Sequence, residues 1–264
     1  MDRALILLTV FAIGACLPAA DRKSVGEDPA INYNIPLWEE GKVPLANGTG
    51  PLDKPFLTVF LPPEDKRNGG SVVVAPGGSN IMLMYGGEGM EIAERYNEWG
   101  VTAFILTYRL SPRYRDDARV LDGKRAIQHV RSRAAEFHLD PAKVGYIGFS
   151  AGSNLGRLVA ASAAADERPD YLALVYGPGR ATPGESLKDF PPTFLLAAAL
   201  DKGTSLGSAQ LFMDLTKAGA TAEIHVYQKG RHGFGSGFGS PNFSDWMPRL
   251  KHFLEQGGFL PEGK

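Results

Sequence analysis

The chain of 264 residues is long enough to bury one sizeable hydrophobic core, and its composition, 44% apolar and 22% charged, is that of a globular protein. The formal net charge of −1 excludes the strong positive field of proteins that bind nucleic acid or anionic membranes, so neither partner is expected. Cys16 is the only cysteine, which excludes a disulfide framework and a cysteine-ligated metal site.

The first twenty residues predict an export signal. Residues 4–15 form an apolar run that is shorter than the about 20 apolar residues of a transmembrane helix, and small residues follow it. Cleavage after Ala20 is one interpretation. The other is a lipoprotein signal, because Ile13–Cys16 (IGAC) resembles a bacterial lipobox in which Cys16 becomes the lipidated first residue. Residues 1–20 are therefore expected to direct the protein to the periplasm or the exterior, in free form or anchored by a lipid.

Residues 21–50 are polar and rich in proline and glycine, which predicts an irregular N-terminal arm. Over residues 51–264, strand-like apolar runs alternate with helical segments, and we expect one catalytic domain there. The predicted strands are Phe56–Pro62, Ser71–Pro76, Val101–Tyr108, Lys143–Phe149, Tyr171–Gly177, Thr193–Leu200 and Ala222–Gln228. The predicted helices are Glu88–Trp99, Asp116–Phe137, Gly152–Ala165, Ser205–Ala218 and Ser244–Gln256. This pattern is typical of a mostly parallel sheet covered by helices on both faces, with ligands at the carboxyl ends of the strands.

Basic residues are scattered along the chain, and in one stretch they alternate with carboxylates. That stretch contains Arg109, Arg113, Arg115, Arg119 and Arg125 together with Asp116, Asp117 and Asp122. The alternation predicts a solvated helix face.

The segment from Gly148 to Gly152 (GFSAG) matches G-x-S-x-G, the pattern of a nucleophile elbow. The pattern alone is weak, since a chain this rich in glycine and serine contains about 0.2 such matches by chance. Its position strengthens it, because Ser150 falls between a predicted strand and a predicted helix, where a strained turn presents the hydroxyl and the helix N-terminus stabilises an oxyanion. Ser150 is therefore the predicted nucleophile, and the alternative is a plain strand–helix loop.

A serine nucleophile needs a base, and His232 is the best placed of the five histidines. It lies in a glycine-rich loop after the last predicted strand. The remaining histidines fall inside predicted helices or a strand and are His129, His138, His225 and His252.

The base needs a carboxylate to orient it, and Asp201 directly follows the predicted strand Thr193–Leu200. Asp189 precedes that strand and Asp214 falls within a helix, so both are badly placed. Serine, aspartate and histidine then follow one another in the chain order of α/β-hydrolases.

Two backbone N–H groups are needed to bind the oxyanion. One predicted donor is Ala151, directly after the nucleophile. The loop after Ser71–Pro76 supplies the other, since Gly77 and Gly78 allow close approach, and Gly78 and Ser79 are the predicted donors there. The alternative is that the two glycines form an ordinary tight turn. No metal and no organic cofactor is expected in this chemistry.

Several spaced motifs together resemble the bacterial acetylxylan esterases, also called xylanase B-like esterases, and the related bifunctional feruloyl and acetylxylan esterases. They are APGGSN, GVTAFILTYRL, DGKRAIQHVRSRAAEFHLDPAKVGYIGFSAG, PPTFLLAAALD and AEIHVYQKGRHGFG, and they span about residues 35–254. The resemblance implies an α/β-hydrolase fold and a serine esterase that removes acetyl, and in some members feruloyl, groups from plant polysaccharide such as xylan. It carries the catalytic serine to Ser150 and the histidine to His232.

The chain departs from that family at two places. Ser79 and Asn80 stand where the family has a glycine and often an aromatic residue in the oxyanion loop. Leu200 and Asp201 stand where it has an Asp-Asp pair, so Asp201 has to serve as the acid from one residue later.

The connection between Gly177 and the strand at Thr193 is short and rich in proline, which predicts that no helical cap covers the site. An open site suits an acylated polysaccharide or a small ester with a short acyl group. The alternatives are a general short-chain carboxylesterase and an inactive binding protein on a hydrolase scaffold. The motifs specify neither the sugar nor the oligomeric state.

Overall fold

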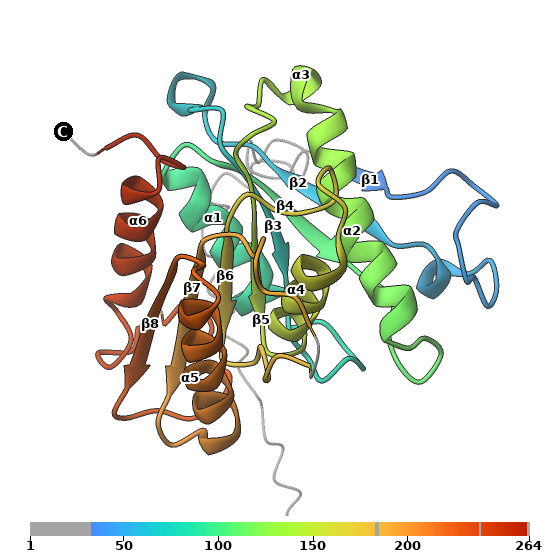
Figure 1. Cartoon of the computed structure of the whole chain (residues 1–264). Coiled ribbons are helices and arrows are strands. Elements are labelled where there is room, and N and C mark those ends of the chain that lie inside the picture. Colours follow the sequence, from blue (N-terminus) through green and yellow to red (C-terminus); the bar gives the residue numbers. More distant parts are fainter. Residues whose placement is uncertain (1–32, 183–184, 238, 263–264) are drawn as a thin grey trace, which may run out of the picture.

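The computed structural model describes residues 33–182, 185–237 and 239–262. Eight strands form one sheet in the order β1-β2-β4-β3-β5-β6-β7-β8 (Figure 1). The strands are β1 (Asn34–Pro36), β2 (Phe56–Phe60), β3 (Ser71–Ala75), β4 (Thr102–Thr107), β5 (Val144–Phe149), β6 (Leu172–Val175), β7 (Thr193–Ala198) and β8 (Ala222–Tyr227). Every predicted strand is present, and each is one to three residues shorter than its apolar run.

The sheet is mostly parallel, as the sequence predicted. From β4 to β8 all neighbouring strands run parallel, while β2 pairs antiparallel with β4 and β1 pairs antiparallel with β2. Strand β1 lies within the segment expected to be irregular. It occupies the sheet edge, where Pro36 removes no hydrogen bond from a central ladder.

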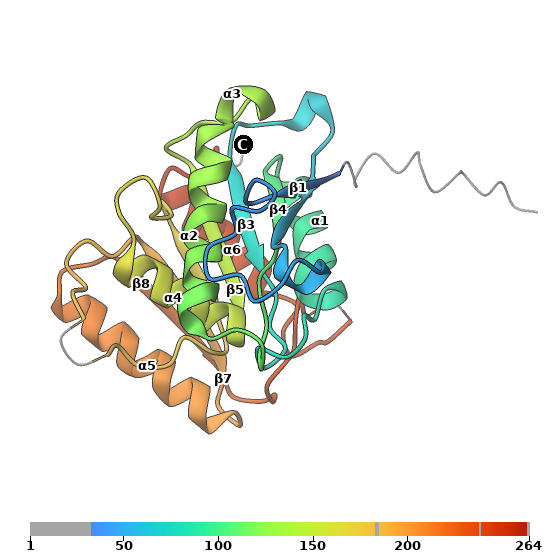
Figure 2. The same cartoon turned by 90° about the vertical axis from the view of Figure 1, so that its right-hand side faces the viewer.

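Helices cover both faces of the sheet. They are α1 (Glu91–Glu98), α2 (Asp116–Ser132), α3 (Ala134–Phe137), α4 (Ala151–Ser162), α5 (Lys202–Lys217) and α6 (Trp246–Gln256). Figure 2 shows α2, α4 and α5 on one side of the sheet and α1 on the other. The two apolar clusters follow this division, because one contains side chains of α2, α4 and α5 and the other contains those of α1 and α6.

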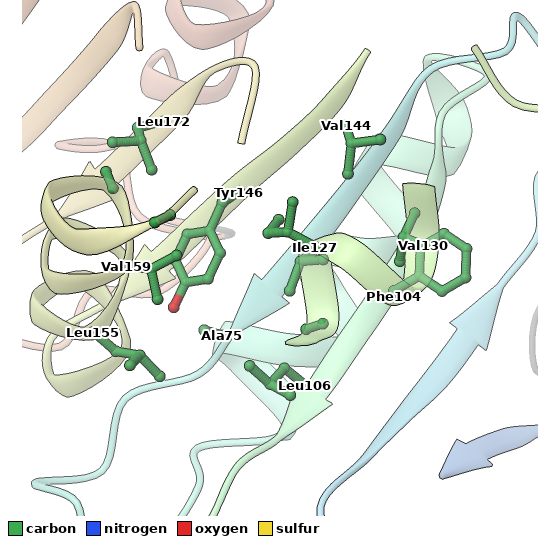
Figure 3. Close-up of a cluster of buried hydrophobic side chains, with 14 of the residues drawn as sticks. Ala75, Phe104, Leu106, Ile127, Val130, Val144, Tyr146, Leu155, Val159 and Leu172 are labelled. Atoms are coloured by element: carbon green, nitrogen blue, oxygen red, sulfur yellow. The ribbon is translucent and has the colours of Figure 1, made fainter. Parts of the chain in front are cut away.

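The fully buried strands divide their side chains between these two clusters. In β5, Val144 and Tyr146 pack toward α2 and α4, whereas Ile147 and Phe149 face the cluster that includes α1 and α6. Figure 3 shows the first cluster, in which Tyr146 lies beside Val159 of α4. Because β5 is buried on both faces, its carboxyl end is a rigid place for a reactive side chain.

Two predicted helices differ from the structure in their regularity. The helix expected from Glu88 begins instead as a π-helical turn over Gly86–Met90 (η3), which continues into α1. The helix expected over Asp116–Phe137 is interrupted at Arg133, so α2 ends at Ser132 and α3 is a single short turn. His138 follows α3 with a φ of 55°, in left-handed backbone and not in a helix.

The sequence predicted that the alternating charges form a solvated helix face. This prediction is wrong for Arg109 and Asp122. The side chains of Arg109 and Asp122 are fully buried and joined by an ion pair of 2.8 Å. Burial raises the pKa of Asp122, against the lowering effect of Arg109. Such a pair costs desolvation that only a complete set of hydrogen bonds offsets, and Arg109 also donates to the carbonyl oxygens of Pro44 and Ala118.

The predicted signal over residues 1–20 lies outside the described residues, and so does the first part of the predicted arm. In the part of the chain that is described, no helix has the length and apolar character to cross a membrane.

Candidate active site

Ser150 lies between β5 and α4, at the carboxyl end of a central strand. Its backbone has a φ of 50°, in a region that side chains other than glycine rarely adopt. The N–H of Ser150 donates to the carbonyl oxygen of Val175 on β6, which ties the turn to the sheet at 3.0 Å. Two residues later, a Cβ on Gly152 would lie 2.1 Å from the carbonyl oxygen of Ala75, so only glycine fits where α4 passes β3. This strained, closely packed turn matches the geometry of a nucleophile elbow.

A chain of hydrogen bonds joins Ser150 to His232 and Asp201. The serine Oγ lies 2.7 Å from His232 Nε2, and His232 Nδ1 lies 2.5 Å from Asp201 Oδ2. Because a carboxylate only accepts hydrogen bonds, the proton of the neutral imidazole is on Nδ1, which leaves Nε2 free to accept the proton of the serine hydroxyl. The arrangement is that of a nucleophile, a base and an orienting acid.

Asp201 reaches His232 from the turn between β7 and α5. Its Oδ2 also accepts a hydrogen bond of 2.5 Å from Thr204 Oγ1, which helps to orient the carboxylate. The other two aspartates lie elsewhere, since Asp189 is exposed ahead of β7 and Asp214 lies within α5 and accepts from Gln210. The structure thus brings the carboxylate of Asp201 to the imidazole, although Leu200 stands one residue earlier.

His232 lies in the loop after β8, with 44% of its side chain exposed. Its ring packs edge-on against Tyr176, at a centroid distance of 5.0 Å. Among the described residues, no other histidine is hydrogen-bonded to Ser150. The others lie on α2 (His129), after α3 (His138), on β8 (His225) and on α6 (His252). Their surroundings are different as well, since His225 pairs with Glu223 at 2.6 Å.

The predicted oxyanion loop lies directly beside Ser150. A Cβ on Gly77 would be 2.7 Å from both the Cβ of Ser150 and the carbonyl oxygen of Phe149, so the loop and the elbow are in contact. The next three residues, Gly78 to Asn80, have φ values of 128°, 56° and 61°. Within the described residues, the N–H groups of Gly78 and Ser79 have no acceptor, which leaves them available to an oxyanion. Ala151 begins α4, where a helix leaves its first N–H groups without an acceptor.

Two residues next to this site were missed by the sequence analysis. Glu88 is 5% exposed and accepts hydrogen bonds from the N–H of Gly77 and from the hydroxyl of Tyr176, each at 2.7 Å. Tyr176 is completely buried, and this burial, reinforced by the negative charge of Glu88, raises its pKa well above the ordinary value. The only signal in the sequence was a charged residue within the apolar face of a predicted helix.

The expected absence of a helical cap concerns the connection that leads from the end of β6 to β7. The connection from Tyr176 to β7 contains no helix at its described positions. Three large apolar side chains of the oxyanion loop are exposed by half or more, namely Ile81, Met82 and Met84. Leu200, beside Asp201, is 58% exposed. No cluster of potential metal ligands occurs among the residues that the structure describes.

Comparison with solved structures identifies the fold. The crystal structure of an acetyl ester-xyloside bifunctional hydrolase from Caldicellulosiruptor lactoaceticus superposes with a TM-score of 0.77 at 28% identity, covering 86% of this chain and 97% of that one. An α/β hydrolase from a Medee basin deep-sea metagenome library superposes with a TM-score of 0.70 at 19% identity, covering 86% of this chain and 98% of that one. This chain has the α/β-hydrolase fold. The predicted fold class, a mostly parallel sheet with helices on both faces, is confirmed.

Comparison of sequences agrees with the resemblance described above. The BD-FAE family model matches residues 57–175 of this chain. An acetylxylan esterase of Xylanibacter ruminicola is 24% identical over 216 residues, which are 70% of this chain. The alignment spans 44% of the length of that relative. Of the three hydrogen-bonded residues, only Ser150 lies within the segment that the family model matches.

Proposed function

We propose that this α/β-hydrolase is a serine carboxylic ester hydrolase that removes short acyl groups from carbohydrate. The observation that carries the proposal is the continuous chain of hydrogen bonds from Ser150 through His232 to Asp201. It lies beside a loop in which two backbone N–H groups have no acceptor among the described residues, which supports an oxyanion site. A binding protein on the same scaffold would have no use for this alignment.

In the proposed reaction, Ser150 Oγ attacks the ester carbonyl while His232 Nε2 takes its proton. Asp201 keeps the imidazole oriented and stabilises it when it is positively charged. The N–H groups of Ala151, Gly78 and Ser79 are the proposed donors to the oxyanion. His232 then protonates the leaving alcohol, which leaves the acyl group on Ser150. In the second half, His232 takes a proton from water, the water oxygen attacks the acyl carbonyl, and His232 returns the proton to Ser150 as the carboxylic acid leaves.

The substrate class is proposed from the relatives and from the open site. One relative is described as an acetylxylan esterase and one solved neighbour as an acetyl ester-xyloside hydrolase. A site without a cap can admit a polymer that carries its ester as a side group. It offers little burial to a long acyl chain, which would otherwise contribute about 0.8 kcal/mol per CH₂.

The reaction class is tested with a fluorescent organophosphonate probe. We expect the wild-type protein to be labelled at Ser150, as located by peptide mass spectrometry, and the Ser150→Ala variant to be unlabelled. Asp189→Asn, which alters an exposed carboxylate outside the site, serves as a matched control and should be labelled like wild type. Absence of labelling in the folded wild-type protein would favour an inactive binding protein.

The acyl preference is tested with p-nitrophenyl esters from C2 to C12 and with acetate and ferulate release from acetylated xylan. We expect kcat/KM to be highest for acetyl or propionyl esters and to fall beyond butyryl. A maximum at C8 or longer would contradict a carbohydrate esterase and favour a lipase. High activity on small esters together with no release from xylan would favour a general short-chain carboxylesterase.

We further propose that the protein is exported, with residues 1–20 as the signal, residues 21–50 as an arm and residues 51–264 as the catalytic domain. The support is the apolar run followed by small residues at the N-terminus. Mass spectrometry of protein from the cell envelope of a bacterial host should find either Asp21 or a lipidated Cys16 as the first residue. An intact Met1 on cytoplasmic protein would contradict export.

A further inference from the structure

Glu88 is a buried carboxylate whose hydrogen bonds go to the segments that surround Ser150. Oε2 accepts from the N–H of Gly77, in the oxyanion loop after β3, and Oε1 accepts from the hydroxyl of Tyr176, at the end of β6. No ion pair within the described residues includes Glu88. An unpaired carboxylate is costly to bury, so its position next to the oxyanion loop needs an explanation other than charge neutralisation.

Tyr176 extends this network to the loop that carries His232. Its hydroxyl oxygen accepts a hydrogen bond of 3.0 Å from the N–H of Gly235, and the same hydroxyl donates a hydrogen bond to Glu88. The ring packs against both His232, at 5.0 Å between centroids, and Phe234, at 4.6 Å. Tyr176 also has a φ of 36°, a backbone value that residues other than glycine rarely adopt.

The π-helical turn over Gly86–Met90 is what presents Glu88 to these partners. A π-helical turn displaces side chains from the regular helical spacing, and such turns occur often at functional sites. The backbone of the same turn lies against the histidine loop, since a Cβ on Gly235 would be 3.1 Å from the carbonyl oxygen of Gly87. One turn of helix therefore contacts both loops that complete the site.

We propose that Glu88 and Tyr176 are positioning residues, which act through Gly77 and Gly235 to hold the oxyanion loop and the His232 loop in register with Ser150. The proposal rests on the proposed esterase function. Neither side chain is required to touch the substrate. Their task is to keep the N–H groups of the oxyanion loop and the imidazole of His232 in the places where the transition state needs them.

Tyr176→Phe and Glu88→Gln test this with little change of volume. Tyr176→Phe keeps the ring against His232 but leaves Gly235 without its acceptor, and we expect kcat for p-nitrophenyl acetate to fall about tenfold. Glu88→Gln leaves one acceptor oxygen in place of two, so one of the two hydrogen bonds is lost or reverses its direction, and we expect a fall of about 10- to 100-fold with KM changed less than about threefold. The double variant should be no worse than about threefold below Glu88→Gln, because the two residues act as one unit.

Tyr227→Phe and Asp245→Asn are the matched controls. The hydroxyl of Tyr227 on β8 donates a hydrogen bond of 2.6 Å to the Asp245 carboxylate, which is also ion-paired with Arg249. The pair thus repeats the tyrosine–carboxylate hydrogen bond, and among the described residues its side chains make no hydrogen bond to the site loops. We expect both controls to lower the thermal midpoint while leaving kcat within about twofold of wild type. Equal losses of kcat in the control pair and the test pair would overturn the proposal, because the effect would then be one of general stability.

Hydrogen exchange measured by mass spectrometry gives a readout that does not depend on turnover. Tyr176→Phe should speed exchange at the Gly235 amide, and Glu88→Gln at both the Gly77 and the Gly235 amides, with the sheet amides unchanged. Unchanged exchange at these two amides, or unchanged kcat in both variants, would refute the positioning role. A wild-type protein that hydrolyses no ester but shows the expected exchange pattern would instead refute the proposed function and leave the network intact.

Discussion

Replacing Asp201 by asparagine separates the charge of the acid from its hydrogen-bond geometry. Both hydrogen bonds of the carboxylate, from His232 Nδ1 and Thr204 Oγ1, end on the same oxygen, Oδ2. The other oxygen has no partner within the described residues. The side-chain amide oxygen of the introduced asparagine can therefore take the place of Oδ2 and accept both bonds, so the imidazole keeps its working tautomer. What the variant loses is the negative charge.

The size of the loss follows from the distance and the exposure. Asp201 is 16% and His232 44% exposed, so the attraction between the carboxylate and the transient imidazolium acts in a partly solvated environment. At about 4 Å between charge centres and an effective dielectric constant of about 20, this attraction is worth about 4 kcal/mol, or about 10³ in rate. We expect kcat to fall by about 10²–10³. An asparagine with its NH₂ group toward the imidazole would impose the wrong tautomer and cost about 10⁴.

The assay is p-nitrophenyl acetate hydrolysis at saturating substrate, with circular dichroism to verify folding. Asp214→Asn, on the same helix that Asp201 precedes, is the control and should keep wild-type turnover. Activity of Asp201→Asn within about tenfold of wild type would remove Asp201 from the catalytic group. A fall of about 10⁴ or more would show that the amide orientation inferred from Thr204 is wrong.

Two further predictions concern packing and pH. Gly152→Ala should lower the free energy of unfolding by about 1–3 kcal/mol and should also lower kcat, because the new Cβ has to displace the backbone at Ala75 beside the oxyanion loop. Thermal melts measure the first effect, and ester hydrolysis measures the second. Burial, reinforced by the positive charges of Arg125 and Arg133, lowers the pKa of His129 from 6.5 to about 4. Between these two pH values the unfolded chain is protonated at His129 and the folded chain is not. Stability should fall as pH decreases from about 6.5 toward 4, and His129→Gln should lessen this fall in urea unfolding curves; parallel curves for variant and wild type would contradict the assignment.

Much of the fold could be predicted because its signals are local. An apolar run such as Val144–Phe149 is buried on both faces and reads as a central strand from its composition alone. Strand β1 could not be predicted in this way. Its three residues include Pro36, and it exists only because Asn34 and Ile35 pair with β2, which lies about twenty residues further along the chain.

The same distinction applies to the site. Ser150, Asp201 and His232 each follow a recognisable strand, so topology alone places them at one edge of the sheet. Glu88 and Tyr176 are 88 residues apart in the sequence. Their contact depends on a π-helical turn, which the apolar periodicity of the sequence did not predict. The buried pair of Arg109 and Asp122 was missed for a related reason, since alternating charges describe a surface unless the tertiary structure closes over them.

The position of β8 has a consequence for how the protein loses activity. Among the described strands, β8 is the last in the sheet and pairs only with β7. It is half-buried for most of its length, whereas β5 is buried throughout. Ser150 thus follows a fully buried central strand, while His232 depends on a half-buried edge strand. Fraying of that edge would separate the imidazole from the serine while the rest of the sheet stays folded. Ester hydrolysis would then report on the local unfolding equilibrium of one strand, and the temperature at which activity disappears would lie below the temperature at which the domain melts.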